Sequence, residues 1–224
     1  MSYNLSTFFT TSTKFRGGKA VWVKDAGHES RANVLNGATI GNPYKGLGYS
    51  FAADLFEYKP FADGLLFRSF LVKTAALIDA TTIVLKADGY SHVPEVGMLL
   101  MVAPATAATT GQSTLVTAVA YSSTAQTFTL TVDTALGVLA PNDILVEAAG
   151  TEASVDATVL VANPNTFIEV DTPYMPTDGS YGIENVLHAI NVVYDKKAWI
   201  ERMQPLPAYV LAKNRSYIDG IFWL

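Results

Sequence analysis

Short runs of apolar and β-branched residues recur along the chain from about residue 63, and several of them alternate apolar with polar positions. Clusters of Gly, Pro, Asn, Asp or Ser bound these runs, which is typical of antiparallel strands. The runs expected to be strands are 63–72, 81–88, 114–121, 127–134, 143–148 and 157–163. Residues 121–126 separate two alternating runs and indicate a hairpin loop. The pattern predicts a mainly β fold, a small antiparallel β-barrel or sandwich.

Two of these stretches look like copies of one another. When residues 82–103 are moved forward by 45 residues without gaps, they lie on residues 127–148. Identical or conservative pairs include Thr82/Thr127, Leu85/Leu130, Asp88/Asp133, Leu100/Leu145 and Ala103/Ala148. Each copy reads as a strand, a turn led by Asp, a loop and a second apolar strand. Two such units can bury their apolar faces against each other, although two unrelated hairpins can also look alike.

The two ends of the chain differ from the middle. Residues 1–60 are rich in Gly, Asn, Ser, Thr and aromatics, and 36–51 are dense in turn residues. They lack a long periodic apolar face, so we expect an arm that orders against a neighbouring surface; a loop-rich half of a single domain is the alternative. We expect a β domain at 61–165 and a C-terminal β extension at 166–224, which closes the fold or an oligomer interface.

Within the C-terminal extension, the residues permit two interpretations. A helical face can be drawn through Ile183, Val186, Leu187, Ile190 and Val193, but 189–203 are rich in β-branched and aromatic residues, which favours strands. Two prolines predict an extended crossing at 203–211. The apolar run 218–224 is expected to be a strand, paired in a sheet or buried in an interface.

Composition narrows the classes of function. Half of the residues are hydrophobic and only 16% are charged, against about 25% in typical domains, which leaves apolar surface for partners. The net charge of −5 argues against direct nucleic-acid binding. The absence of cysteine excludes disulfides, thiolate metal sites and thiol nucleophiles. No apolar run approaches the roughly 20 residues of a membrane span, and no targeting segment is evident, so we expect synthesis and assembly in the cytoplasm.

Few residues of the chain have the type and spacing that a catalytic or metal-binding site requires. His28, His92 and His188 are isolated, apart from a helical Glu184–His188 spacing that is more typical of a surface pair than of a metal site. The carboxylates of Asp88, Asp133 and Asp143 sit at turns, where bonding to the local backbone is the ordinary role and calcium the alternative. Trp22, Trp199 and Trp223 lie in apolar runs, as core or interface anchors do. No nucleophile elbow or complete phosphate loop occurs. We expect no enzyme activity, no cofactor and no metal.

The repeated stretch also carries a resemblance. Residues 117–148, TAVAYSSTAQTFTLTVDTALGVLAPNDILVEA, resemble the repeated barrel module of phage head fibre and capsid-decoration proteins, in which a hairpin and a Gly-Asp turn precede a strand. Asn142 stands where that module usually has glycine, and asparagine tolerates the left-handed conformation. The ending 197–224 is similar to the closing strands of such proteins. The whole chain is similar to head fibre proteins of crAss-like tailed phages.

The resemblance implies a non-enzymatic virion protein on the capsid exterior, a homo-oligomer with a trimer favoured, bound to the major capsid protein. Its implied partners include no nucleic acid and no membrane, with host glycans a candidate at the exposed end. For the capsid contact of the arm we expect Phe8, Phe9, Trp22, Tyr44 and Tyr49, and for the oligomer interface Trp199, Phe222 and Trp223. The alternatives are a tail or portal-associated virion protein and a carbohydrate-binding adhesion module.

Overall fold

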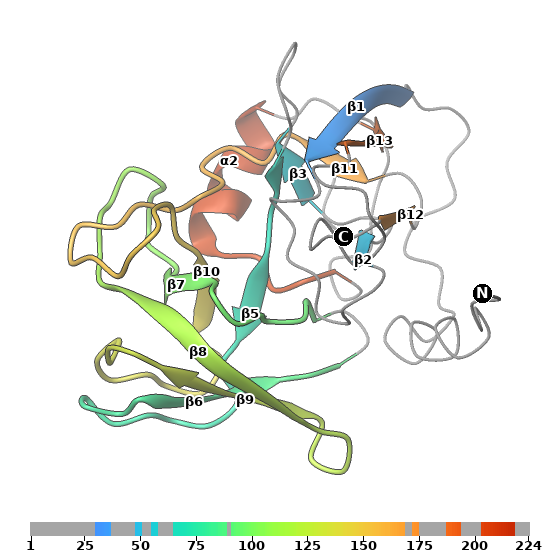
Figure 1. Cartoon of the computed structure of the whole chain (residues 1–224). Helices are drawn as coiled ribbons and strands as arrows, with labels where there is room; N and C mark the ends of the chain where they lie inside the picture. The colour runs from blue at the N-terminus through green and yellow to red at the C-terminus, as the bar shows by residue number, and fades with distance from the viewer. Residues whose placement is uncertain are drawn as a thin grey trace, which may run out of the picture.

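The computed structural model describes residues 30–36, 48–50, 55–57, 65–88, 91–168, 172–174, 187–193 and 203–217, and strands dominate them (Figure 1). The fold is mainly β and antiparallel, as the alternating pattern predicts. The elements are β1 (Ser30–Asn36), β2 (Gly48–Ser50), β3 (Leu55–Glu57), β4 (Leu65–Leu66), β5 (Ser69–Leu71), β6 (Thr82–Lys86), β7 (Leu99–Val102), β8 (Ser113–Ser122), β9 (Thr127–Val132), β10 (Ile144–Glu147), β11 (Thr166–Ile168), β12 (Thr172–Tyr174), β13 (Leu187–Val193) and helix α2 (Ala208–Tyr217).

A six-stranded sheet with the order β5-β10-β7-β8-β9-β6 holds the repeated stretch. Its two outermost strands approach each other at one point. There, Val72 and Leu85 form an isolated bridge, and the backbone N–H of Lys73 donates to the carbonyl of Val84 at 2.8 Å. This single bridge does not pair the two strands along their length, so the sheet curls without closing into a hydrogen-bonded barrel.

A five-stranded sheet, β1-β13-β11-β3-β4, and the pair β12-β2 make up the rest of the described β structure. Strands β1, β2 and β3 come from residues 1–60, where the sequence predicts an arm. Leu55 and Phe56 of β3 have no exposed surface. The predicted boundary at residue 60 therefore runs through a sheet, and the arm interpretation is left to residues 1–29, which lie outside the described residues.

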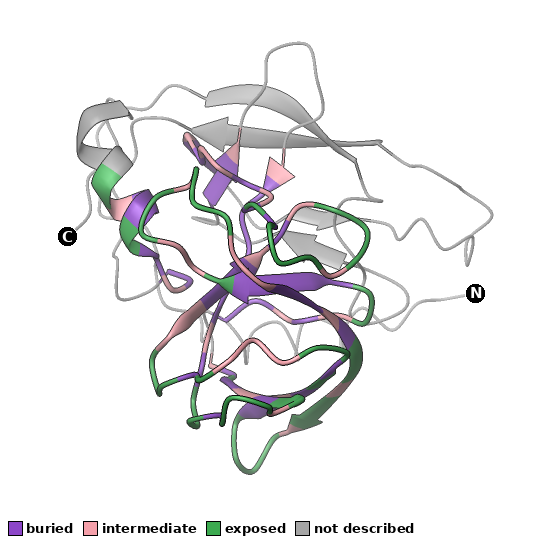
Figure 2. Ribbon diagram, turned by 90° about the vertical axis from the view of Figure 1, so that its left-hand side faces the viewer, coloured by how far each residue is buried: buried purple, intermediate pink, exposed green. Residues whose placement is uncertain are grey.

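Two clusters of buried side chains form the core (Figure 2). The first joins β3, β11 and α2 to one side of β7 and β10, and it includes Leu55, Phe67, Phe167 and Tyr209. The second fills the six-stranded sheet, and its members include Phe70, Leu85, Leu100, Leu130 and Leu145. The chain crosses from the first cluster to the second between Phe67 and Phe70.

Equivalent positions of the two copies lie opposite each other in the strand register. In the antiparallel β6–β9 pair, Val84 at the centre lies opposite Thr129, its own equivalent under the 45-residue shift. In the β7–β10 pair, Met101 at the centre lies opposite Val146, again its own equivalent. Each strand of the first copy therefore pairs with the same strand of the second about a local two-fold axis.

Backbone hydrogen bonds outside the regular ladders repeat in the same way. Four bonds in one copy have a counterpart of nearly equal length in the other, although Val72 and Val116, which take part in the first two, lie 44 and not 45 residues apart. The matched pairs are Gly97 N–Val116 O (2.8 Å) with Asn142 N–Val72 O (2.8 Å), Val116 N–Met98 O (2.9 Å) with Val72 N–Asp143 O (2.8 Å), Ala103 N–Ile144 O (2.8 Å) with Ala148 N–Leu99 O (2.9 Å), and Ala87 N–Gln126 O (3.0 Å) with Val132 N–Thr81 O (2.9 Å). Such agreement across four bonds is not expected of two unrelated hairpins.

The turn before the second strand of each copy needs a residue with positive φ. Gly97 has a φ of 91° and Asn142, its equivalent, a φ of 73°. Glycine and asparagine tolerate this region better than other residues. The departure at Asn142 from the glycine of the resembling module is therefore compatible with the same turn.

Three secondary-structure predictions need correction or completion. The expected strand at 157–163 is wrong: this segment makes only isolated bridges, Ala157 to Gly111 and Val159 to Ala148, because its hydrogen bonds are divided between two different segments. The strand interpretation is confirmed for 189–193, which belong to β13, and the helical alternative is wrong for 187–193. The expected strand at 218–224 lies outside the described residues.

The extended crossing predicted for 203–211 ends earlier than expected, since α2 begins at Ala208. Pro207 lies directly before the helix, where a missing N–H costs no hydrogen bond, and its carbonyl accepts bonds from the N–H groups of Val210 and Leu211. The two prolines of this segment, which predicted an extended crossing, therefore come directly before a helix. No helix among the described residues is long and apolar enough to cross a membrane.

Candidate functional site

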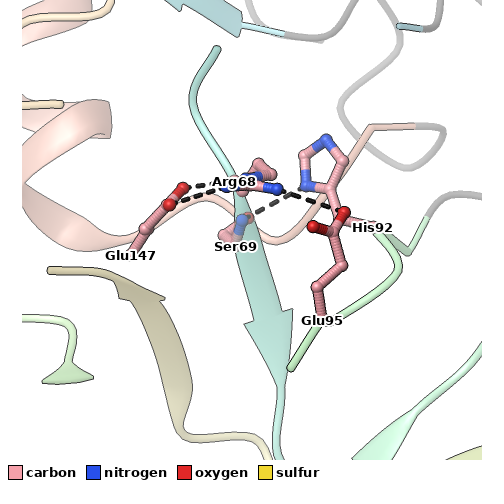
Figure 3. Close-up of polar contacts among 5 residues, drawn as sticks. All are labelled: Arg68, Ser69, His92, Glu95 and Glu147. Atoms are coloured by element: carbon pink, nitrogen blue, oxygen red, sulfur yellow. Dashed lines mark hydrogen bonds and ion pairs between the residues drawn. The ribbon is translucent and has the colours of Figure 1, made fainter. Parts of the chain in front are cut away.

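A cluster of buried charged side chains lies where the chain passes between the two core clusters (Figure 3). The guanidinium of Arg68 donates from Nε to Oε2 of Glu147 at 2.8 Å and from Nη2 to Oε1 at 2.6 Å. Its Nη1 lies 3.4 Å from Oε1 of Glu95. This bidentate arrangement is the strongest geometry for an arginine–carboxylate pair, and it joins the β4–β5 connection to the end of β10.

Glu95 is the unusual member of the cluster. Burial raises its pKa to about 7, because the charged form loses hydration; Arg68 opposes this shift and the nearby charge of Glu147 adds to it. The guanidinium is already engaged by Glu147 in two hydrogen bonds, so it offers Glu95 only one long contact. Near neutral pH the cluster therefore lies close to the point at which Glu95 takes up a proton.

Ser69 and His92 complete the cluster. The N–H of Ser69 donates to Nδ1 of His92 at 3.2 Å, and the Ser69 hydroxyl donates to the carbonyl of Pro205 at 2.5 Å. The His92 ring is buried and meets Phe70 edge-on. His92 is therefore a core histidine, and Ser69 connects the segment before α2 to the six-stranded sheet. The arrangement holds these segments together, and the Ser69 hydroxyl hydrogen is directed to a backbone carbonyl.

The aspartates at turns act through local hydrogen bonds. Oδ2 of Asp143 accepts from the N–H of Ala140 at 2.7 Å, and Oδ1 of Asp88 accepts from the hydroxyl of Ser91 at 2.9 Å. These two bonds confirm the turn-bonding interpretation. Asp133 instead reaches β8, where Oδ1 accepts from the N–H of Leu115 at 2.8 Å; this bond lowers the Asp133 pKa. The described part of the chain contains no group of three His, Asp or Glu side chains that could hold a metal ion.

A pocket of about 290 Å³ lies between the six-stranded sheet and the segment that leads into α2. Apolar side chains supply most of its wall, and Lys86 and Asp88, paired at 2.9 Å, supply charged groups. Gln204 also contributes to the wall, but its amide atoms are buried and make no hydrogen bond within the described structure. The polar groups Lys86, Asp88 and Ser91 of this wall bond to one another, with the Ser91 hydroxyl donating to Oδ1 of Asp88 at 2.9 Å.

The outer surface carries several exposed apolar side chains. Among the described residues, the most exposed large apolar side chains are Leu77 (80%), Val138 (71%), Val155 (69%), Val96 (65%) and Ile78 (62%). The bridge between Ala76 and Leu139 places Leu77 opposite Val138 on the solvent side. The hairpin of β8 and β9 also projects beyond the rest of the sheet (Figure 1). Its strand β8 is exposed from Thr117 to Tyr121, apart from a half-buried Val119.

Most residues predicted to contact partners lie outside the described residues: Phe8, Phe9, Trp22, Tyr44, Trp199, Phe222 and Trp223. Tyr49 lies in β2 and pairs with Pro173 of β12. These contact predictions stay predictions. The Arg68 cluster was missed because its partner Glu147 is 79 residues away. The available signal was a single charge inside the apolar run LLFRSFL, where an unpaired arginine would be costly.

No protein-family model matches this chain, and no curated protein matches it significantly in sequence. The function of this chain is therefore inferred from its own residues and from the resemblance of residues 117–148 to the head fibre module.

Proposed function

We propose that this protein is a non-enzymatic structural subunit of a phage virion, a head fibre or capsid-decoration protein that binds the major capsid protein as a homo-oligomer. The observation that carries the proposal is the pseudo-symmetric unit formed by 82–103 and 127–148. Residues 127–148, the larger part of the stretch that resembles the head fibre module, lie in this unit, and β8 pairs directly with it.

The distribution of polar and apolar groups supports a structural role. The buried charges of Arg68, Glu147 and Glu95 are engaged with one another, and the aspartates at turns bond to neighbouring groups. The exposed apolar side chains, by contrast, remain available for protein surfaces. Assembly by many weak contacts on a repeating lattice needs no chemistry, because occupancy is stabilised by mass action.

The test is binding of the purified full chain to empty shells of the major capsid protein encoded by the same genome. We expect saturable co-sedimentation of the full chain, and its loss when residues 1–29, which contain Phe8, Phe9 and Trp22, are deleted. This deletion ends before β1, whereas removal of residues 1–60 would also delete β3 from the core.

The matched control is the triple substitution Phe8→Ala, Phe9→Ala and Trp22→Ala in the full chain, which keeps the length and charge of the arm. Loss of binding in both variants, with unchanged thermal unfolding, assigns the contact to the aromatic residues. A full chain that does not bind the shells at all, or that enters particles only at the tail or portal, would contradict the proposal.

A further inference from the structure

We propose that the pocket of about 290 Å³ between the six-stranded sheet and the segment leading into α2 binds a compact neutral amide with an apolar substituent, such as an aromatic carboxamide. The name Gln204 pocket is used below for it. The inference goes beyond the virion role, because it concerns a ligand of the single chain and needs no capsid. It rests on the wall of the pocket and on one buried amide in that wall.

The amide of Gln204 is the unusual group at this pocket. The residue is 1% exposed, and neither its Nε2 nor its Oε1 has a hydrogen-bond partner among the described residues. A buried amide of this kind destabilises the folded state, because both atoms have lost their hydrogen bonds to water. Gln204 also forms part of the pocket wall. A ligand in the pocket can therefore supply a donor for Oε1 and an acceptor for Nε2.

The amide reaches such a ligand when the end of its side chain turns. Both polar atoms are covered in the structure, but the adjoining pocket gives the side chain room to rotate. Rotamer changes of this kind are common when a site binds its partner. A second amide matches the first best, because it too carries an N–H donor beside a C=O acceptor.

The wall of the Gln204 pocket suits an apolar molecule and is held in place by the fold. Leu71 and Ile144 lie opposite each other in the β5–β10 pair, and Met203 contributes from the segment before α2. The Ser69 hydroxyl donates to the carbonyl of Pro205 at 2.5 Å, which ties this segment to β5. A mainly apolar, pre-formed pocket with few polar groups is typical of small-molecule sites.

The charged groups at the pocket disfavour an ionised ligand. Lys86 and Asp88 are paired with each other at 2.9 Å, and the Ser91 hydroxyl donates to Asp88. An anion would meet the carboxylate of Asp88, and a cation would meet the ammonium of Lys86. Either ion would also lose hydration against the apolar wall. A neutral ligand avoids both costs.

The surroundings of the pocket favour a small molecule over a protein segment. A bound segment usually pairs its main chain with a free strand edge or lies in a long groove. Strand β5 is already paired with β10, and Val72, the residue after β5, bridges to Leu85 of β6. The volume of the pocket is near the lower end for ligand sites, so it holds one compact molecule.

The experiment is an NMR titration of the purified full chain with phenylacetamide, observed at the methionine methyl groups. Met203 lines the pocket, so its signal should shift saturably, with a Kd in the millimolar range expected of so small a ligand. Met98 belongs to the second core cluster and should not respond. Phenylacetate, the charged counterpart of similar shape, should bind about tenfold more weakly or less.

Two variants separate ligand recognition from stability. Gln204→Leu should weaken phenylacetamide binding about tenfold, the loss expected for hydrogen bonds of ordinary strength. It should keep or raise the unfolding temperature, because it removes a buried amide that has no partner. The matched control is Gln112→Leu, since the Gln112 amide donates to the carbonyl of Ser113 at 2.6 Å. This control should bind phenylacetamide as wild type does and gain no stability.

Four results would overturn the inference. The first three are the absence of a saturable Met203 shift, equal binding of phenylacetate, and unchanged binding by Gln204→Leu. The fourth is a lower unfolding temperature for Gln204→Leu, which would give the amide a structural role. A blocked Gly-Phe-Gly peptide that binds more tightly than phenylacetamide would assign the pocket to a protein segment and would also contradict the proposed ligand class.

These outcomes are independent of the proposed function, because none of them involves the capsid. A chain that binds empty shells but not phenylacetamide keeps the virion proposal and loses the ligand site. A chain that binds phenylacetamide through Gln204 but never binds shells keeps the ligand site, and the virion proposal fails.

Discussion

The two copies of the repeat, 82–103 and 127–148, share their framework and differ at their surfaces. Both place a positive-φ residue at the same turn, Gly97 in one and Asn142 in the other, and both bury a leucine at the centre, Leu100 and Leu145. They differ in the connections that precede them. Residues 72–81 fold back against Leu139, whereas the β8–β9 connection forms a hairpin whose Ala125 carbonyl accepts from the ammonium of Lys73 at 2.6 Å.

This comparison separates residues that specify the fold from residues available for partners. Positions that match under the 45-residue shift lie in the strand pairs and turns, where the pseudo-two-fold requires the same backbone twice. Positions that do not match carry the special features: Glu147, bonded to Arg68, is equivalent to Val102.

The largest expected effect tests whether the two copies contribute equally to the core. Leu100→Asp and Leu145→Asp each bury an unpaired charge at a position with no exposed surface, so each should cost more than about 4 kcal/mol in the free energy of unfolding. Denaturant titration of both variants provides the measurement. The control Val138→Asp, at an exposed position, should change stability by less than about 0.5 kcal/mol. If only one leucine variant is destabilised, the equivalence of the copies fails.

The second effect tests a position where the copies differ. Glu147→Ala removes both hydrogen bonds of the bidentate pair with the buried guanidinium of Arg68, and should cost about 3 kcal/mol. The equivalent change in the first copy, Val102→Ala, removes a partly exposed side chain and should cost less than about 1 kcal/mol. Equal losses, measured by denaturant titration, would show that the ion pair adds no stability beyond ordinary packing.

The third effect concerns pH, through Glu95, whose counterpart in the second copy is Ala140. The pKa of Glu95 is raised from 4.5 to about 7 in the folded state, so the folded state holds the extra proton. The contribution of the protonated Glu95 carboxyl to the free energy of unfolding is present in full below pH 4.5 and is lost as the pH rises through 7. Glu95→Gln cannot ionise, so its stability relative to wild type should increase by up to roughly 3 kcal/mol between pH 4.5 and 8.

Unfolding free energies of wild type and Glu95→Gln across this pH range give the measurement. Glu152→Gln, an exposed substitution, serves as the control and should follow the wild-type curve. Parallel curves for Glu95→Gln and wild type would mean that Glu95 is ionised without cost in the folded protein.

The smallest effect tests the shared turn. Gly97→Ala places a side chain at a φ of 91°, where the added Cβ meets no neighbouring atom within 4 Å, so the cost is backbone strain alone, about 1–2 kcal/mol. Asn142→Gly restores the glycine of the resembling module and should leave stability within about 0.5 kcal/mol of wild type. Thermal unfolding of both variants compares them. If Gly97→Ala is neutral, the turn does not depend on its positive φ.

Local patterns predicted most of the six-stranded sheet. The alternation at 127–132 and the apolar run at 99–102 predicted their strands. The gapless shift predicted two similar units that bury their apolar faces against each other, but not that equivalent strands pair with one another. The strand predicted at 157–163 was wrong, because the β-branched residues of this segment pack into the core without belonging to one ladder. The extended crossing predicted at 203–211 ended too late, because a proline such as Pro207 favours the start of a helix as readily as it excludes a strand.

The candidate site was harder to predict than the fold. The only local signal for this cluster was the charge of Arg68 within an apolar run. The neighbouring sequence did not identify Glu147 or Glu95 as its partners, because long-range pairing depends on how the sheet is folded.

The central claim, that this chain is a structural component of a capsid surface, is tested most directly by stoichiometry. In particles purified from the phage whose genome encodes the chain, quantitative gel densitometry compares its amount with that of the major capsid protein. The account predicts a fixed small-integer ratio that repeats over the whole lattice and falls when residues 1–29 are removed. Absence of the chain from purified particles, or its presence only in the few copies of a portal or tail ring, would contradict it.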